Sequence, residues 1–527
     1  MDTKRFIDET TAKERIGSAV LVSEREDEVY VAVGAEEFGR MCLALHHRLH
    51  SPVMMYFAVD ERREHQSYGL YCAFLSAEHK KWFFVRMTIP EENPRFSSIS
   101  KEIYSASLFE REMKEMFGLE PEGHPDLRRL HLHDEVWPEG FYPLKKDFGS
   151  PEDTGRTKRE YRFKRVEGEG LFEVPVGPVH AGIIGPGHFR FSVAGEPIIH
   201  LEARLGFTHR GVEKLFEGRS LSEAIKLSES IAGDSAFSYS MAFCQGIEKI
   251  SGLRVPERAR RLRAVFLELE RMVNHAADIG GIALDVGFTF PSAYASILKE
   301  SLLRLNEKVS GNRYLKGINQ AGGVGKDLNQ GQAGLLSDSL SEILEDFREL
   351  KGMLLGSVSF MDRVDKTGVL NRKTASDLGV VGLAGRASGI GLDLRKVFPG
   401  PYQALSLNVV KQEEGDVLAR LKVRLHEFEE SARLIKALLQ RLGPEEVISS
   451  GRRSMQEGFG LGYVEGWRGP VLCWIKTDRS GAIDRCKIVD PSFRNWNGLC
   501  FAAPGNIIPD FPLCNKSFNL SYSGNDL

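Results

Sequence analysis

The pattern of apolar and polar positions divides the chain into two parts of different character. In residues 1–149, short runs of apolar and branched residues stand beside one run whose apolar positions recur every three to four residues. The short runs are typical of strands and the longer run of a helix. This part is therefore expected to be a small α/β domain, with strands at 29–33, 53–59, 70–75 and 82–87 and a helix at 36–49.

Residues 150–170 are nearly all polar or charged, which predicts a linker between two domains. Beyond it, helical spacing of apolar residues extends over 256–284, 293–310, 331–351 and 417–442. Near the C-terminus, 470–475 and 482–489 alternate like two strands joined by a turn at 478–481. The predicted fold class is α+β: a small α/β domain at 1–149, the linker at 150–170, and a mainly helical domain at 171–527 with small β elements at its ends.

Composition narrows the class of protein. A net charge of -3 offers no basic excess for nucleic acid. The apolar runs are far shorter than the roughly 20 residues needed to cross a bilayer, so no membrane-spanning helix is expected. No secretory signal follows Met1, so we expect a cytoplasmic location. The seven cysteines are scattered and no two form C-x-x-C, which predicts buried, reduced thiols and no iron–sulfur or zinc site within this chain alone.

One motif of the first domain is specific. Residues 110–130 read EREMKEMFGLEPEGHPDLRRL and residues 142–147 read YPLKKD. They predict a short helix ending near Gly118, a Gly-His-Pro-Asp turn, and a basic segment that could hold an acidic partner surface. The segment resembles the small peripheral-arm subunit of complex I (NADH:quinone oxidoreductase) and its counterpart in group 4 NiFe hydrogenases. That resemblance implies a scaffold role for this domain.

Five motifs of the second domain extend the resemblance to essentially the whole chain, as a fusion of two subunit types. They occur in the order seen in the large subunits of group 4 (energy-converting, membrane-bound) NiFe hydrogenases, and the quinone-site subunit of complex I has similar landmarks. The motifs are GPVH at 177–180, PGHFR at 186–190, HRGVEK at 209–214, ELERMVNH at 268–275, and 414–424.

The metal ligands of that family are missing here. In the hydrogenases, two cysteine pairs in R-x-C-G-x-C-x-x-x-H and D-P-C-x-x-C hold nickel and iron, a site that demands soft thiolates. The first motif aligns with 230–239 and the second with 519–524. The four cysteine positions are then occupied by Ala232, Ser235, Ser521 and Gly524, and Tyr239 replaces the histidine.

Neither remaining thiol near these motifs is a convincing substitute. Cys244 lies on the helix expected after the first motif, and Cys514 lies well before the second. Two isolated thiols cannot supply four ligands, so no nickel–iron binding is predicted. The quinone site of complex I is also altered, since its head-group histidine and tyrosine align with Ile184 and Gly233.

Polar groups remain that could pass protons or hydrogen-bond a polar head group in a cleft. For His188 and Arg190 the alternative is loop anchoring, and for Glu213 it is a buried ion pair. Asp234 is either a proton carrier or the cap of the following helix. The candidates are His180, His188, Arg190, His209, Glu213, Asp234, Tyr239, His275 and Asp285, of which Asp285 resembles an aspartate near the quinone of complex I.

The resemblance implies a large subunit of a membrane-associated, ion-translocating oxidoreductase complex. It would pass electrons from iron–sulfur clusters of partner subunits to a quinone or another acceptor, without hydrogen chemistry. The implied partners are a small iron–sulfur subunit, a ferredoxin-like subunit and antiporter-like membrane subunits, which would hold the chain at the cytoplasmic face of the membrane. Two alternatives stay open: a non-catalytic coupling subunit, and a genuine hydrogenase with an unforeseen ligand set.

No cofactor is expected to bind this chain alone. The glycine-rich segment 382–389 is not clearly placed between a strand and a helix, as a dinucleotide fingerprint requires. NAD, if used, is therefore expected on another subunit.

Overall fold

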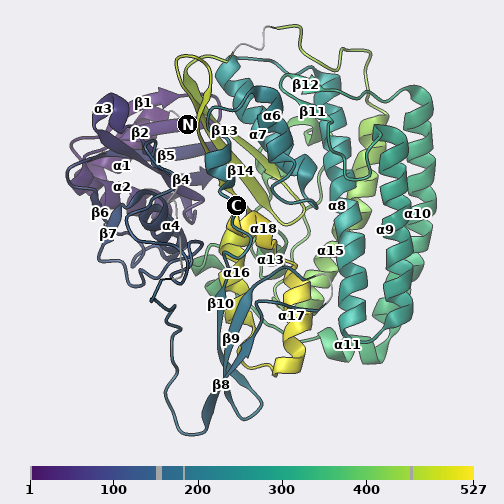
Figure 1. The fold of residues 1–527 in the computed structure, drawn as a ribbon. Helices are drawn as coiled ribbons and strands as arrows, with labels where there is room; N and C mark the ends of the chain where they lie inside the picture. Colours follow the sequence, from purple (N-terminus) through teal and green to yellow (C-terminus); the bar gives the residue numbers. More distant parts are fainter. Residues whose placement is uncertain (1–2, 150–156, 182–183, 452–454) are drawn as a thin grey trace.

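The computed structural model describes residues 3–149, 157–181, 184–451 and 455–527. Its first part is built on a five-stranded sheet in the order β1-β2-β5-β4-β3, in which only β2 and β5 pair in parallel (Figure 1). The strands are β1 (Val20–Glu24), β2 (Glu28–Ala32), β3 (Met55–Asp60), β4 (Ser67–Ser76) and β5 (Lys81–Pro90). The helices are α1 (Thr3–Glu14), α2 (Ala35–Leu49), α3 (Arg62–His65) and α4 (Ser107–Phe117), and β6 (Arg95–Ser97) pairs with β7 (Glu120–Glu122). The predicted strands and helix are confirmed.

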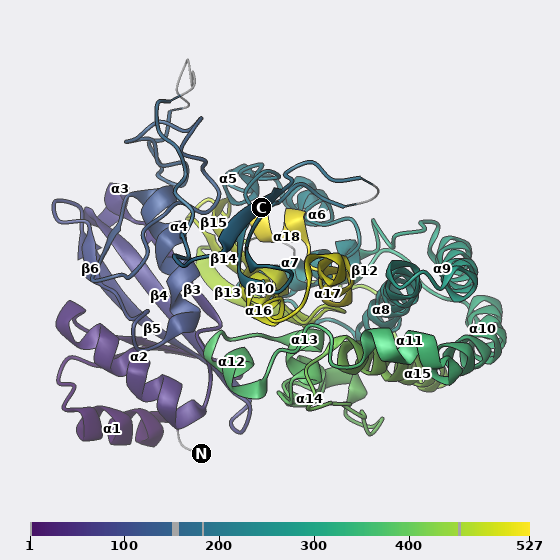
Figure 2. The same cartoon turned by 90° about the horizontal axis from the view of Figure 1, so that it is seen from below.

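Both faces of this sheet are covered, which explains the unbroken apolar run at 53–59. Neighbouring side chains of a strand point to opposite faces. Tyr56 of β3 therefore stacks on Phe38 of α2, with ring centroids 5.9 Å apart, while Phe57 faces Trp474 at 4.8 Å. Helices α1 and α2 lie together at one edge of the molecule in Figure 2. The opposite face of the sheet packs against the C-terminal part of the chain.

The second part is dominated by a helical bundle (Figure 1). Helix α8 is buried along most of its length and packs between α9 and α15. Its strongly polar residues Glu268, Arg271 and His275 are nevertheless buried, and their spacing places them on one face. The bundle helices are α8 (Glu257–Asp285), α9 (Thr289–Ser310), α10 (Gln330–Gly356), α11 (Val358–Val364) and α15 (Val417–Leu439), so the four predicted long helices are confirmed.

Two three-stranded antiparallel sheets complete the second part, in agreement with the predicted α+β class. One consists of β8 (Leu171–Val176), β9 (His188–Ala194) and β10 (Ile198–Arg204). The other consists of β13 (Gly458–Glu465), β14 (Pro470–Thr477) and β15 (Ile483–Val489). The last two strands form the predicted hairpin, closed by hydrogen bonds between Asp478 and Ala482 and between Asp478 and Gly481.

The remaining helices and two short strands complete the second part. They are α5 (Val212–Leu215), α6 (Leu221–Ser228), α7 (Ala236–Ser251), β11 (Asn319–Gln320), β12 (Gly323–Val324), α12 (Arg372–Asp377), α13 (Gly382–Ala387), α14 (Leu394–Val397), α16 (Pro491–Ala502), α17 (Phe511–Phe518) and α18 (Tyr522–Asp526). Within the described residues, no helix combines the length and apolarity that a membrane span needs.

The described part of the predicted linker lies against both parts of the chain. The Thr157 amide donates to the Glu135 carbonyl at 2.8 Å, and the Tyr161 hydroxyl donates to Glu202 of β10 at 2.7 Å. Residues 150–156 lie outside the described ranges. The domain boundary drawn at 150–170 stays a prediction.

Candidate functional site

An arginine joins the two segments that carry the four positions predicted to replace the metal ligands. Arg468, in the turn between β13 and β14, donates to both carboxylate oxygens of Asp234 at 3.0 and 2.6 Å. Its Nε donates to the Asn519 carbonyl at 2.6 Å. Asp234 lies between Ala232 and Ser235, and Asn519 precedes the segment of Ser521 and Gly524. A bidentate guanidinium thus holds these segments together within the chain.

The side of the site nearest Gly524 is filled by protein atoms. A Cβ added to Gly524 would lie 2.7 Å from Asp490 Oδ2 and 2.8 Å from Tyr239 Oη, closer than real Cβ contacts come. Tyr239, in turn, donates a short hydrogen bond to Asp490. Ser521 is occupied as well, since its hydroxyl accepts from the Gly524 amide at 2.9 Å and caps α18.

These residues do not fit a nickel–iron centre. Such a centre needs four thiolates, and the side chains here are a methyl group, two hydroxyls and a hydrogen. Across the described residues, no group of three or more His, Cys, Asp or Glu side chains is arranged to hold a metal ion. Cys244 on α7 and Cys514 on α17 are buried, as predicted.

Replacing Gly524 by cysteine is expected to destabilise the fold rather than restore a ligand. The added side chain must displace Asp490 or Tyr239, and such overpacking costs about 1–3 kcal/mol in unfolding free energy. Gly233→Ala is the matched control, because no atom lies within 4 Å of its added Cβ. Urea unfolding of both variants checks this, and equal stability of the two would contradict the packing described.

Asp234 is an ion-pair partner, not a helix cap. The N-cap of α7 is Ser235, whose side chain makes no capping hydrogen bond. The Glu270 carboxylate caps this helix end instead, accepting from the Phe237 amide at 2.8 Å and the Ser238 amide at 3.2 Å. Burial raises the pKa of Asp234, but the charge and hydrogen bonds of Arg468 outweigh it and lower the pKa overall. The carboxylate therefore stays ionised at neutral pH, which disfavours the proton-carrier interpretation. Its side chain is still 37% exposed, so it remains accessible to a ligand or a partner.

The loop that carries Ile184 packs on α18. A Cβ at Gly185 or Gly187 would meet the Tyr522 ring at 2.6 and 2.8 Å, so only glycine allows this approach. Ile184 is 41% exposed and Gly233 is exposed as well. A small cavity beside Arg468 has no room for a water molecule and is lined by Leu383, Ala384, Arg424, Trp467, Arg468, Asn495, Phe518 and Leu520.

Comparisons with known proteins agree with this architecture. The model of "Respiratory-chain NADH dehydrogenase, 30 Kd subunit" matches residues 31–154, and that of the 49 Kd subunit matches residues 285–459. The chain is 31% identical over 512 residues to formate hydrogenlyase subunit 5 of Escherichia coli (strain K12), covering 95% of this chain and 89% of that protein. This chain belongs to the family of fused complex I-type and hydrogenase-type subunits.

Two further members of the family show its breadth. Hydrogenase-4 component G of Escherichia coli (strain K12) is 30% identical over 526 residues, with 98% of this chain and 91% of that protein covered. The C/D subunit of the NADH-quinone oxidoreductase of Bacteroides thetaiotaomicron is 30% identical over 408 residues, covering 73% of this chain and 76% of that protein. The resemblance inferred from the motifs is confirmed.

The remaining candidate residues each have their own partners in the structure, and the single cleft expected for them stays a prediction. His188 and Arg190 lie on β9, where Arg190 pairs with Glu173 at 2.9 Å and lies over Phe163. The His188 ring lies 3.3 Å from the Gly177 carbonyl, and His180 contacts the Gly187 carbonyl at 2.7 Å. These contacts tie the loop to the sheet, as the loop-anchoring alternative predicts.

His209 and Glu213 lie where the two parts of the chain meet. Glu213 is buried and pairs with Arg485 at 2.7 Å and Lys487 at 3.1 Å. Although burial raises its pKa, the two cations lower it overall. Burial lowers the pKa of His209, whose ring stacks on His131 of the first part at 5.6 Å. The ion-pair alternative for Glu213 thus fits the structure.

His275 and Asp285 lie on α8 at different depths. Asn274 donates to the Asp234 carbonyl at 2.8 Å, so the neighbouring His275 lies close to the site. The His275 ring, however, contacts Glu427 at 2.9 Å and not Asp234. Asp285 is 11 residues beyond Asn274, or about 16 Å along the helix axis. Burial raises the pKa of Asp285, and the Lys516 charge opposes this. Asp285 therefore does not share a site with Asp234.

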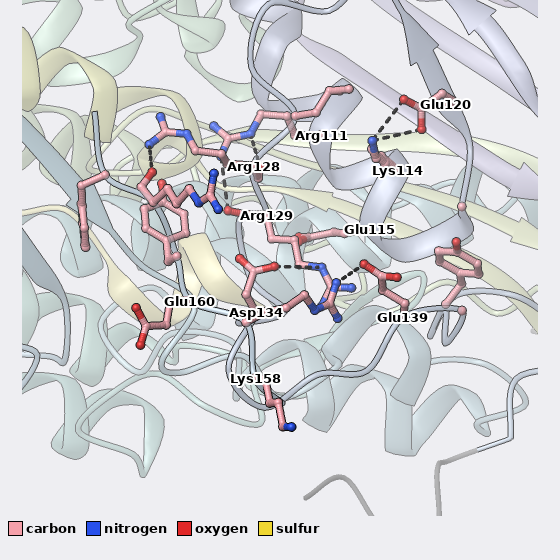
Figure 3. Close-up of a pocket in the computed structure, with 18 of the residues that line it drawn as sticks. Arg111, Lys114, Glu115, Glu120, Arg128, Arg129, Asp134, Glu139, Lys158 and Glu160 are labelled. Carbon is pink, nitrogen blue, oxygen red and sulfur yellow. Dashed lines mark hydrogen bonds and ion pairs between the residues drawn. The ribbon is translucent and has the colours of Figure 1, made fainter. Parts of the chain in front are cut away.

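A cavity of about 1500 Å³ lies elsewhere, and Arg190 is the one candidate residue among the described residues that line it. Its walls are charged, and Figure 3 shows Lys114 turned toward Glu120. Arg128 and Arg129 of the basic segment also line it, but Arg128 pairs with Asp126 and Glu202, and Arg129 donates to backbone carbonyls. These two arginine side chains bind groups of this chain, so they are not free to bind an acidic partner surface.

Sequence patterns missed the partners that define the site, Arg468 and Asp490. Arg468 stands in the Gly-Trp-Arg-Gly turn before a predicted strand, and Asp490 stands between a predicted strand and Pro491. A charged residue in a tight turn and an aspartate before a proline are common, so neither signal is specific.

Proposed function

We propose that this chain is the large subunit of a membrane-associated, ion-translocating oxidoreductase complex, in which it brings electrons from partner iron–sulfur clusters to a quinone or another acceptor without nickel–iron hydrogen chemistry. The observation that carries this proposal is the presence of the Arg468–Asp234 and Tyr239–Asp490 pairs beside the predicted ligand positions, within the retained family fold. The relatives are named as parts of formate hydrogenlyase, hydrogenase-4 and NADH-quinone oxidoreductase, which supports a role in a complex.

We propose that the electron acceptor binds at the surface formed by Gly233 and Asp234. Both residues are accessible to solvent, and the pair with Arg468 presents a fixed polar group to a polar head group. The proposed neighbours are a small iron–sulfur subunit, a ferredoxin-like subunit and antiporter-like membrane subunits, with the chain peripheral at the cytoplasmic face. NAD, if used, binds another subunit in this proposal. No strand of the described chain leads directly into α13, which supports that assignment.

A structural coupling role is the second candidate, and the continuous core favours it. Side chains of β14 and β15 belong to the same hydrophobic cluster as the sheet of the first part. A displacement of either part is therefore transmitted to the other, because packed cores are stiff.

Asp234→Asn in the complex purified from its native host distinguishes the two candidates. If Asp234 orients an acceptor, losing its charge should lower the rate of acceptor reduction by about tenfold or more, equivalent to about 1.4 kcal/mol of activation free energy. Asp338→Asn, at an exposed position of α10, is the control. An intact Asp234→Asn complex with unchanged rates would reject the acceptor site and leave the coupling role.

A further inference from the structure

A second concentration of charge lies inside the fold, between α8, α13, α14, α15 and β13. It contains four carboxylates and three guanidinium groups, and none of the seven residues is more than 5% exposed. The carboxylates belong to Glu268, Asp393, Glu427 and Glu465, and the guanidinium groups to Arg271, Arg386 and Arg395.

Ion pairs connect all seven residues. Arg386 donates to Glu427 at 2.8 Å and to Glu465 at 2.7 Å. Arg395 pairs with Glu268 at 3.1 Å and with Asp393 at 2.7 Å. Arg271 links the two groups, lying 3.1 Å from Glu268 and 3.5 Å from Glu427.

The charges in this cluster do not balance. Four carboxylates face three guanidinium groups, which leaves one negative charge uncompensated in a water-excluded interior. The neighbours do not cancel it: Arg424 is itself paired with Asp278 at 2.8 Å, and Tyr402 and Ser431 donate to Glu268 as neutral hydroxyls. Burial lowers the pKa of His275, which contacts Glu427, so this ring is neutral near pH 7. An unbalanced buried charge is costly, and binding a proton removes it.

We propose that Glu465 of this cluster binds one exchangeable proton and forms a proton-storage site beside the Asp234–Arg468 pair. The step is a simple protonation: the Glu465 carboxylate takes a proton from water and becomes a carboxylic acid, and no electron moves. Burial, followed by the charge of Asp393, raises the pKa of Glu465 to about 7. Glu427 is not the proton site. Burial raises the pKa of Glu427, but the charge of Arg386 outweighs this effect, so the pKa is lowered overall.

The backbone connects this residue directly to the candidate site. Glu465 is three residues before Arg468, and Arg271 donates to the carbonyls of Glu465 and Gly466 at 2.6 and 3.1 Å. In the same turn, Trp467 Nε1 donates to the Asp234 carbonyl at 3.1 Å. Only the link between proton uptake and acceptor reduction rests on the proposed function, whereas proton binding at Glu465 does not.

Infrared titration of the purified full chain tests the site without any acceptor. A buried carboxylic acid C=O band should disappear with a midpoint of about pH 7 as the pH rises. Burial also raises the pKa of Glu110, Glu115 and Glu270 to about 7, so these carboxyls contribute to the same band. The band should therefore lose the amplitude of one carboxyl in Glu465→Gln and keep its full amplitude in Glu345→Gln, an exposed carboxylate of α10. If Glu465→Gln does not fold, Asp393→Asn provides the test, because losing that negative charge should move the midpoint to lower pH.

A stability measurement gives a second, independent readout. The pKa of Glu465 is raised in the folded chain above its ordinary 4.5, so the folded state holds this proton where the unfolded state has lost it. Its contribution to stability is complete below about pH 4.5 and is lost as the pH rises through about 7. Glu465→Gln should reduce that slope by the share of one carboxyl. A band of unchanged amplitude in Glu465→Gln, or no titrating band in the wild-type chain, would overturn the proposal.

Discussion

Trp474→Ala is expected to lower the free energy of unfolding by about 3–5 kcal/mol, because it opens a cavity where the two parts of the chain share their core. Trp474 is fully buried, and its ring lies 4.8 Å from that of Phe57 and 5.3 Å from that of Tyr71 in the first part. Its Nε1 also donates to the Tyr30 hydroxyl at 3.1 Å. Urea unfolding followed by circular dichroism measures the loss.

The control for this prediction is Phe290→Ala, at a position that is 66% exposed. That change removes an aromatic ring of similar kind from the surface of α9 and should shift stability by no more than about 0.5 kcal/mol. A Trp474→Ala chain as stable as Phe290→Ala would show that the two parts do not depend on one another.

Arg386→Met is expected to cost a similar amount, about 3–5 kcal/mol, because it leaves buried carboxylates without their partner. Arg386 is fully buried and pairs with Glu427 and Glu465. Adding Glu465→Gln to Arg386→Met should recover part of the loss, since it removes one stranded charge. Arg348→Met on the exposed face of α10 is the control, and an equal effect of the two methionine variants would contradict the account of the cluster.

Much of the fold could be predicted from local patterns. The helix expected at 417–442 is α15 (Val417–Leu439), and the Asp416 side chain caps its start as aspartate commonly does. The short helix expected to end near Gly118 is α4 (Ser107–Phe117), and Gly118 adopts the left-handed conformation with φ of 72°. These features depend on neighbouring residues and are therefore visible in the sequence.

The site could be predicted only in part, because its partners are distant in sequence. The degenerate positions Ala232, Ser235, Ser521 and Gly524 are read from the motifs alone. The pair of Asp234 with Arg468 spans 234 residues and that of Tyr239 with Asp490 spans 251, beyond the reach of periodicity. The same holds for Asp285, which lies on α8 11 residues beyond Asn274, the residue that contacts the Asp234 carbonyl.

We expect that this member of its family has an arginine–carboxylate pair and a tyrosine–carboxylate pair in place of the nickel–iron ligand set. The hydrogenase alternative requires a ligand set, and Asp490 and Tyr239 fill the space beside Gly524 where one thiolate would stand. The measurement that tests this most directly is elemental analysis of the intact complex, purified from its native host through a tag on this chain. We expect iron in the amount of the partner clusters and no nickel, whereas one nickel atom per chain would contradict the absence of a nickel–iron centre.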